Sequence, residues 1–362
     1  MSGAPAAHEV DNDWTREETG PIDPGFALDL LARRLPRAEL HTHLAGAFRP
    51  SFTRGVPREP GRPDSSHDYL DVGAFFAKHK TFAEAVGSLD AVTRATSRVL
   101  EGAIDSGCRH VEVSVNGTEF LGSGLDFGEL LLAAGRAFDI VREELGVTGG
   151  LIVAMDRDSS LDTAFATLRQ AEAARDGGSP VLGIGNDGFP SRALTEFAPA
   201  FEAARASGFR TTCHANKAHD IGEALDRIDH AWELQGDPAL QARVAARGIP
   251  VTMAMSSCLM MLPGRFPTAA AFPFEELRRA GVAVTLNIDD GGMFFTDSAQ
   301  EYRLAARTYG YDASTLADIG LASLEAAWIT EDRPHRLAAW RREADALITD
   351  PRAPRTHGEP TE

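Results

Sequence analysis

Short apolar runs alternate along this chain with longer stretches in which apolar residues recur every three or four positions. The short runs have the composition of buried strands, whereas the longer stretches, such as 126–145 and 238–248, have the spacing of amphipathic helices. Eight strands that alternate with helices predict an α/β fold, a parallel eight-stranded (β/α)8 TIM barrel in a single domain. The predicted strands cover residues 38–44, 109–116, 150–156, 180–186, 209–216, 227–232, 250–257 and 282–290.

Two kinds of segment interrupt this alternation. Residues 1–24 and 351–362 are rich in Pro, Gly and charge, so we expect mobile tails on either side of a barrel domain at 25–350. The segment 51–71, rich in Pro, Arg, Gly and Ser, follows the first predicted strand, where barrels carry active-site loops. It is either a lid over the site or a surface insertion without function.

Composition narrows the classes of partner. The 362 residues are 43% hydrophobic, and their net charge of -17 argues against nucleic acid or an anionic membrane as a partner. The three cysteines, Cys108, Cys213 and Cys258, are isolated, so a disulfide framework is not expected. Neither a secretion signal nor a membrane-length apolar stretch is evident, and we expect a soluble cytoplasmic protein. Its oligomeric state is left open.

Residue types that bind divalent metals lie at or near the ends of several predicted strands. His41 and His43 are two positions apart, so on a strand their side chains share one face, about 7 Å apart along the chain. The C-terminal ends of barrel strands are where such enzymes place their chemistry. The pattern predicts a nitrogen and oxygen ligand set suited to Zn²⁺ and, less selectively, to Fe²⁺ or Mn²⁺. The candidates are His41, His43, His214, Asp289 and Asp290.

Each candidate also has an ordinary structural interpretation. A single histidine near the end of a strand, such as His214 or His230, can be a hydrogen-bonded core residue, and the pair Asp289 and Asp290 can cap a helix. The glycines that follow at 291–292 permit a close turn more readily than they begin a helix, which favours the metal interpretation.

A glycine-rich run at 183–188 fits the dinucleotide-binding pattern and follows a predicted strand. That motif must open a helix, whereas Phe189 and Pro190 come next, and it usually lies in the first strand-helix unit of its domain. We therefore reject a nicotinamide cofactor.

With these residues the chain resembles the adenosine deaminases of the metal-dependent amidohydrolase superfamily. The resemblance covers almost the whole predicted domain and is carried by the order and character of four segments, 36–44, 75–78, 237–240 and 287–290. It implies an eight-stranded barrel, hydrolytic deamination and zinc as the usual catalytic ion. The metal ligands that it implies are His41, His43, His214 and Asp289.

The resemblance also implies roles for residues around the metal. His230 would orient and deprotonate the metal-bound water, and Asp290 would hydrogen-bond the substrate ring. Gly188 would offer a backbone contact to the substrate.

Two departures from the family pattern fall on the substrate side. Ala45 stands where the family has an aspartate that contacts the nucleoside sugar, and Lys217 stands where it has a glutamate that protonates the purine. Lys217 could replace that proton donor, bind a substrate anion or a developing oxyanion, or turn outward to solvent. A further difference is the segment 254–258, in the region of the seventh strand.

These observations predict a zinc-dependent hydrolytic deaminase that takes a small heterocyclic or nucleoside-like substrate. We expect a modified nucleoside, a purine-like base or another cyclic amidine, and not standard adenosine. One alternative is a metal-dependent hydrolase of a different C–N bond, an amide or cyclic imine, with Lys217 as the acid or oxyanion group. Another is an inactive barrel that binds nucleosides.

Overall fold

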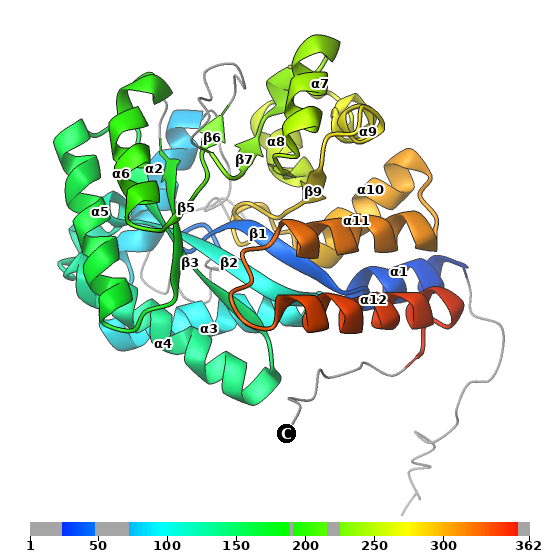
Figure 1. The fold of residues 1–362 in the computed structure, drawn as a ribbon, viewed down its shortest axis with the longest axis horizontal. Helices are drawn as coiled ribbons and strands as arrows, with labels where there is room; N and C mark the ends of the chain where they lie inside the picture. Colours follow the sequence, from blue (N-terminus) through cyan, green and yellow to red (C-terminus); the bar gives the residue numbers. More distant parts are fainter. Residues whose placement is uncertain (1–23, 48–71, 189–190, 216–224, 354–362) are drawn as a thin grey trace, which may run out of the picture.

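The computed structural model describes residues 24–47, 72–188, 191–215 and 225–353 (Figure 1). Both predicted tails lie almost wholly outside these ranges, as does the segment 51–71. The domain bounds at 25 and 350 therefore stay a prediction.

Parallel strands form two sheets. The first has the order β1-β2-β3-β4-β5 and the second the order β6-β7-β8-β9, and every pairing is parallel. The eight predicted strands are all present, with the fifth in two pieces. The strands are β1 (Arg37–His43), β2 (Cys108–Asn116), β3 (Thr148–Asp156), β4 (Val181–Asp187), β5 (Arg210–Thr211), β6 (His214–Ala215), β7 (Ile228–His230), β8 (Val251–Met253) and β9 (Val284–Leu286).

The residues between β5 and β6 bind to both sheets. The amide of Thr212 donates to the carbonyl of Ile184 in β4 at 3.1 Å, and the carbonyl of Cys213 accepts from the amide of Asp229 in β7 at 2.8 Å. The short break thus marks the change of pairing partner along one strand.

The other edges of the two sheets meet beyond β9. Asp289 forms a parallel bridge with Thr42 of β1, and its amide donates to the carbonyl of His41 at 2.8 Å. The buried carboxylate of Glu39 also accepts from the side-chain amide of Asn287 at 3.0 Å. The strands therefore encircle a common core, and the fold is that of a (β/α)8 barrel, as predicted.

Helices alternate with these strands, and several of them begin at a side-chain cap. Asp126, for example, accepts from the amide of Glu129 at the start of α4, and Gly146 ends that helix with φ 67°. Figure 1 shows α11 and α12, in orange and red, beside the blue α1, so the two ends of the described chain pack together. The helices are α1 (Pro24–Arg34), α2 (Val72–Glu84), α3 (Leu89–Asp105), α4 (Phe127–Leu145), α5 (Leu161–Asp176), α6 (Ala198–Ala206), α7 (Pro238–Arg247), α8 (Met255–Met261), α9 (Phe274–Arg279), α10 (Ser298–Tyr309), α11 (Ala313–Ala326) and α12 (Arg333–Thr349).

The prediction of a strand over 250–257 is wrong at its end. β8 stops at Met253, and α8 begins at Met255. The buried carboxylate of Glu301 accepts from the amides of Met255 and Ser256 at 3.0 and 3.2 Å. A carboxylate that accepts from the first amides of a helix stabilises the start of that helix. Because Glu301 lies more than forty residues after Met255, the sequence around the start of α8 does not reveal this contact.

Candidate metal centre

Three imidazoles from two strands turn one nitrogen each toward a common point. His41 and His43 lie on β1, and His214 begins β6. The Nε2 atom of His43 lies 3.3 Å from Nε2 of His41 and 3.2 Å from Nε2 of His214. The three rings lie close together at angles to one another, with centroids 4.8 to 5.3 Å apart.

His43 and His214 each face an oxygen atom at their second ring nitrogen, Nδ1. These oxygens indicate which nitrogen of each ring carries the proton. Nδ1 of His214 lies 2.9 Å from the carbonyl oxygen of Asn186, and Nδ1 of His43 lies 3.3 Å from Oδ2 of Asp187. The carbonyl oxygen is an acceptor, so Nδ1 of His214 carries the proton and its Nε2 presents a lone pair. The carboxylate that faces Nδ1 of His43 favours the same placement of the proton in that ring.

His41 reaches the same state through a hydroxyl. The Thr252 hydroxyl donates to Oδ1 of Asp229 at 2.7 Å, so it accepts from Nδ1 of His41 at 2.9 Å. Its Nε2 is then also a lone pair. Three lone pairs that face one another at about hydrogen-bond distance repel unless a cation lies between them, which is the arrangement of metal-binding histidines.

Asp289 adds a carboxylate to this group. Its Oδ1 lies 3.3 Å from Nε2 of His41 and 3.4 Å from Nε2 of His43, and its Oδ2 accepts from the Ser257 hydroxyl. Asp289 has φ 58°, in the left-handed region that non-glycine residues seldom adopt. The backbone bridge to β1 holds it there, so this conformation aims the carboxylate at the histidines.

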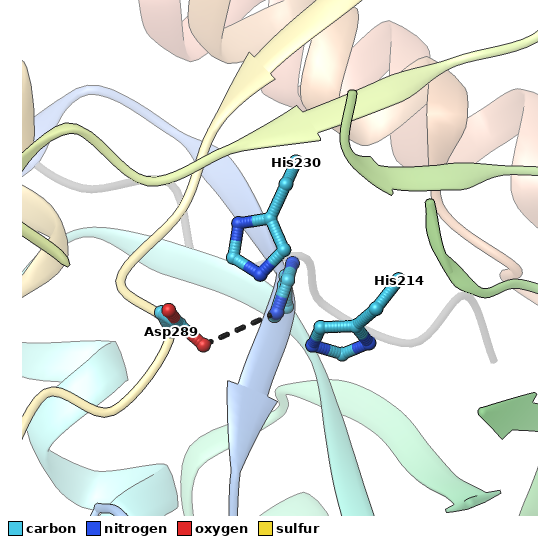
Figure 2. Close-up of side chains that lie close together, drawn as sticks. His214, His230 and Asp289 are labelled. Carbon is cyan, nitrogen blue, oxygen red and sulfur yellow. Dashed lines mark ion pairs between the residues drawn. The ribbon is translucent and has the colours of Figure 1, made fainter. Parts of the chain in front are cut away.

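His230, at the end of β7, completes the cluster. One ligand atom each from His41, His214, His230 and Asp289 lie within 4.8 Å of one another. Figure 2 shows the rings of His214 and His230 and the carboxylate of Asp289 turned toward the same centre. His230 has φ 67°, and among the described residues its buried Nδ1 has no hydrogen-bond partner.

The surrounding charges favour a cation at this centre. Burial by itself lowers the pKa of His41, but Asp229 and Asp289 outweigh burial and raise it. Burial would also lower the pKa of His43, but the carboxylates of Asp290, Asp187 and Asp289 together raise it well above its usual value. The carboxylates thus create a negative field that favours positive charge among the rings, which a metal ion can supply.

The structure describes three of the four residues that were predicted to lie near the substrate. Asp290 is buried, and its Oδ1 lies 2.9 Å from Nε2 of His79. Gly188 directly follows β4 and has φ 84°, a conformation that suits glycine, and Ala45 is fully buried. Lys217 lies outside the described residues, so its role stays a prediction.

Several residues of the site were missed by the sequence analysis. Asp187 is the last residue of β4 and Asp229 lies within the short strand β7, and both acidic residues could have been noticed beside the predicted site. Thr252 lies inside β8, and His79 and Glu119 lie on α2 and on the 3-10 helix η2 (Gly117–Ser123), with no local signal.

Comparison with known proteins identifies the family. The family model described as adenosine deaminase matches residues 36–340. This chain belongs to the adenosine deaminase family. It is therefore a hydrolase of the deaminase kind that acts on C–N bonds other than peptide bonds.

Its relatives span nearly the whole chain. An aminodeoxyfutalosine deaminase of Streptomyces coelicolor is 28% identical over 338 residues, covering 88% of this chain and 87% of its own. An adenine deaminase of the same organism is 29% identical over 324 residues, covering 83% and 93%. A solved amidohydrolase of Burkholderia ambifaria with bound Zn has a TM-score of 0.80 at 26% identity, covering 92% of this chain and 96% of its own.

Among the described ranges, no helix is both long enough and apolar enough to cross a membrane.

Proposed function

We propose that this family member is a zinc-dependent hydrolytic deaminase of a purine-like base or modified nucleoside, and not of standard adenosine. The observation that carries the proposal is the convergence of three Nε2 lone pairs and one carboxylate oxygen. This donor set fits zinc, which prefers nitrogen and oxygen ligands in a catalytic site. His41, His43, His214 and Asp289 would hold the ion.

A bound zinc ion would supply a hydrolytic water with its pKa lowered to about 7 and would polarise the carbon under attack. Burial lowers the pKa of His230 to about 4 against the opposing influence of Asp289. The ring of His230 is therefore neutral near pH 7, so it would be free to hydrogen-bond that water and to take up its proton in the chemical step. Asp290 would position the substrate ring, and the backbone at Gly188 would contact it.

Three observations support a substrate other than adenosine. Ala45 offers no carboxylate to a nucleoside sugar and is fully buried. The two Streptomyces relatives are named for the deamination of aminodeoxyfutalosine and of adenine, neither of which is adenosine. By the family resemblance Lys217 would stand where the family has a glutamate, which would change the charge at that position by two units if the lysine is protonated.

Lys217 also supports a second candidate, hydrolysis of an amide or cyclic imine with the lysine steadying the developing oxyanion. The third possibility, an inactive binder, has less support, because His230 provides a proton acceptor that binding alone does not need.

The test is ammonia release by the zinc-loaded full-length protein from adenine, adenosine, modified adenosines, amides and cyclic imines. We expect a kcat/KM of about 10⁴ M⁻¹s⁻¹ or more on a purine-like base or modified nucleoside, and less on adenosine. Lys217→Ala should abolish turnover of the true substrate. Adenosine turnover above that level would show an ordinary adenosine deaminase, and cleavage of amides or imines alone would favour the second candidate.

A further inference from the structure

His79 joins the substrate side of the site to two other elements. Its ring on α2 is 3% exposed, with Nδ1 2.9 Å from Oε1 of Glu119 on η2 and Nε2 2.9 Å from Oδ1 of Asp290. Both partners are carboxylates, which accept hydrogen bonds, so both ring nitrogens donate. Burial alone would lower the pKa of His79, but Glu119 and Asp290 outweigh burial and raise it to about 10.

The position of α2 is fixed by apolar packing as well. The ring of Phe75 stacks on that of Phe294, with centroids 5.4 Å apart and planes 5° apart. Phe82 and Met293 complete this small cluster, which is separate from the main core. Phe294 follows Asp290 by four residues, so the same turn that carries Asp290 also holds α2.

On the side away from His79, the backbone of the turn that follows β1 packs against Asp290. A Cβ atom at Gly46 would lie 1.5 Å from Oδ1 of Asp290, so the glycine makes room for this carboxylate. Oδ1 is therefore enclosed between Gly46 and His79 and bonded to a ring that carries positive charge. Because His79 contacts Oδ1, the second carboxylate oxygen, Oδ2, is the atom of Asp290 that would meet a substrate.

We propose that His79 is a positioning and specificity-determining residue, which holds Asp290 as a hydrogen-bond acceptor and so selects ring systems that present an N–H to it. A free purine base carries an N–H on its five-membered ring and can shift it between the two ring nitrogens. A 9-substituted purine has only a lone pair on that ring, which a carboxylate repels. His79 and Asp290 together would thus select free bases over nucleosides. Ala45, which offers no carboxylate to a nucleoside sugar, favours the same substrates.

This proposal rests on the proposed function, because it takes Asp290 as the group that faces the substrate ring. Its test does not require turnover. The probes are purine and 9-methylpurine, which differ at the ring nitrogen and lack an amine to be released. Their binding to the zinc-loaded full-length protein is measured by calorimetry for wild type, His79→Gln and Glu119→Gln.

Wild type should bind purine about tenfold or more tightly than 9-methylpurine, since one charge-assisted hydrogen bond is gained or lost. His79→Gln should bring the ratio to within about threefold, because a neutral amide no longer holds Asp290 as an obligatory acceptor. Glu119→Gln keeps the shape of its side chain and should lower the ratio less, which gives a second variant if His79→Gln folds poorly. An unchanged ratio in both variants, with zinc bound, would overturn the proposal.

A matched control is His110→Gln. His110 is also buried and bonded to a carboxylate, with Nε2 3.1 Å from Oε1 of Glu112, but it lies at the opposite end of the barrel. This variant should lose stability and keep the purine preference. A preference lost equally in His110→Gln would show that the ratio reports general destabilisation and not the contact of His79 with Asp290.

The nitrogen-15 NMR shifts of the His79 ring give a readout that is independent of binding and turnover. The His79 signals are identified by their loss in His79→Gln. Both nitrogens should show attached protons in wild type, and Glu119→Gln should shift the Nδ1 signal. A neutral ring in wild type would contradict the proposal. Intact signals and purine preference without any ammonia release would instead contradict the proposed function alone.

Discussion

Histidines and carboxylates are buried at both ends of this barrel, but the two groups are hydrogen-bonded in different ways. At the N-terminal end, Oε1 of Glu112 accepts from the amide of Trp328 at 2.7 Å and from Nε2 of His110 at 3.1 Å, and Oε2 pairs with Arg227 at 2.6 Å. Each carboxylate oxygen has a donor there. At the C-terminal end, the Nε2 atoms of three histidines face one another, with Nε2 of His43 3.3 Å from that of His41 and 3.2 Å from that of His214.

The difference separates a structural network from a site. The fully buried Arg227 also stacks over the ring of Trp328 at 4.1 Å, so charge is balanced and packed at the N-terminal end. The rings of His41, His43 and His214 each face an oxygen at Nδ1, while their Nε2 atoms gather around one point beside the carboxylate of Asp289, where a cation can bind. Buried histidines alone therefore do not mark a metal centre. The direction of their lone pairs does.

The largest effect should come from removing a metal-facing ring. His214→Ala leaves three ligands, which hold an ion poorly, so most of the zinc should be lost. Turnover should fall well beyond the roughly 10–100-fold that loss of an outer hydrogen-bonding partner costs. Elemental analysis of purified wild type and variant decides this. Equal zinc content in the two would show that the lone pairs do not converge on a metal.

Removing the proton acceptor should slow the chemical step and spare the metal. We expect His230→Ala to lower kcat by about 10²–10⁴-fold with nearly unchanged zinc content. Steady-state kinetics on the substrate found in the ammonia screen, with zinc measured in parallel, tests this. Loss of zinc with the variant would place His230 among the ligands.

The N-terminal network should respond in stability and not in metal content. Glu112→Ala leaves the buried Arg227 without its carboxylate, and we expect a loss of about 3–5 kcal/mol in the free energy of unfolding. Urea denaturation measures this loss, and zinc per folded chain should stay that of wild type. A variant that folds normally but binds no zinc would break the distinction between the two ends.

A substitution at Thr252 should have a smaller effect, on zinc affinity alone. Thr252→Val keeps the shape of the side chain but removes the hydroxyl that accepts from Nδ1 of His41, so zinc affinity should fall about 10–100-fold. Competition with a zinc chelator measures the affinity. The matched control is Thr285→Val on β9, whose hydroxyl bonds to Asn287 at 2.7 Å. Equal affinity losses in both would argue against a specific role for Thr252.

The smallest expected effect is on acid stability. Burial by itself would raise the pKa of Glu112, but Arg227 and His110 outweigh burial and hold this pKa below its usual range. Its stabilisation is therefore present above the unfolded-state pKa of about 4.3 and is lost as the pH falls through the lower folded-state value. Glu112→Gln should give a shallower loss of stability below about pH 4 in urea titrations. An unchanged slope would mean that Glu112 does not ionise differently in the folded protein.

Much of the fold was predictable from periodicity. The eight strands follow from short apolar runs, and the adenosine deaminase family follows from segments such as 36–44 and 287–290. The pairing of His41 with His43 was visible because strand residues two apart share a face. The sequence could not show that α8 begins at Met255, because the carboxylate that stabilises its start belongs to Glu301.

The substrate side was predictable only in part. Asp290 was found because it follows Asp289, but His79 and Glu119 belong to a helix and a short 3-10 helix whose own patterns give no reason for chemistry. Their meeting depends on the stacking of Phe75 on Phe294, which is a tertiary contact between residues more than two hundred positions apart. Local patterns carry no information about such a contact.

X-ray absorption at the zinc edge of the loaded protein shows whether three imidazoles and one carboxylate bind the ion. Cys213 and Cys258 lie next to His214 and Ser257 in the sequence, so sulfur ligation is the natural competitor. The account predicts only nitrogen and oxygen neighbours at about 2.0–2.2 Å, with the scattering pattern of several imidazoles. Sulfur at about 2.3 Å, or a spectrum with no imidazole contribution, would contradict it.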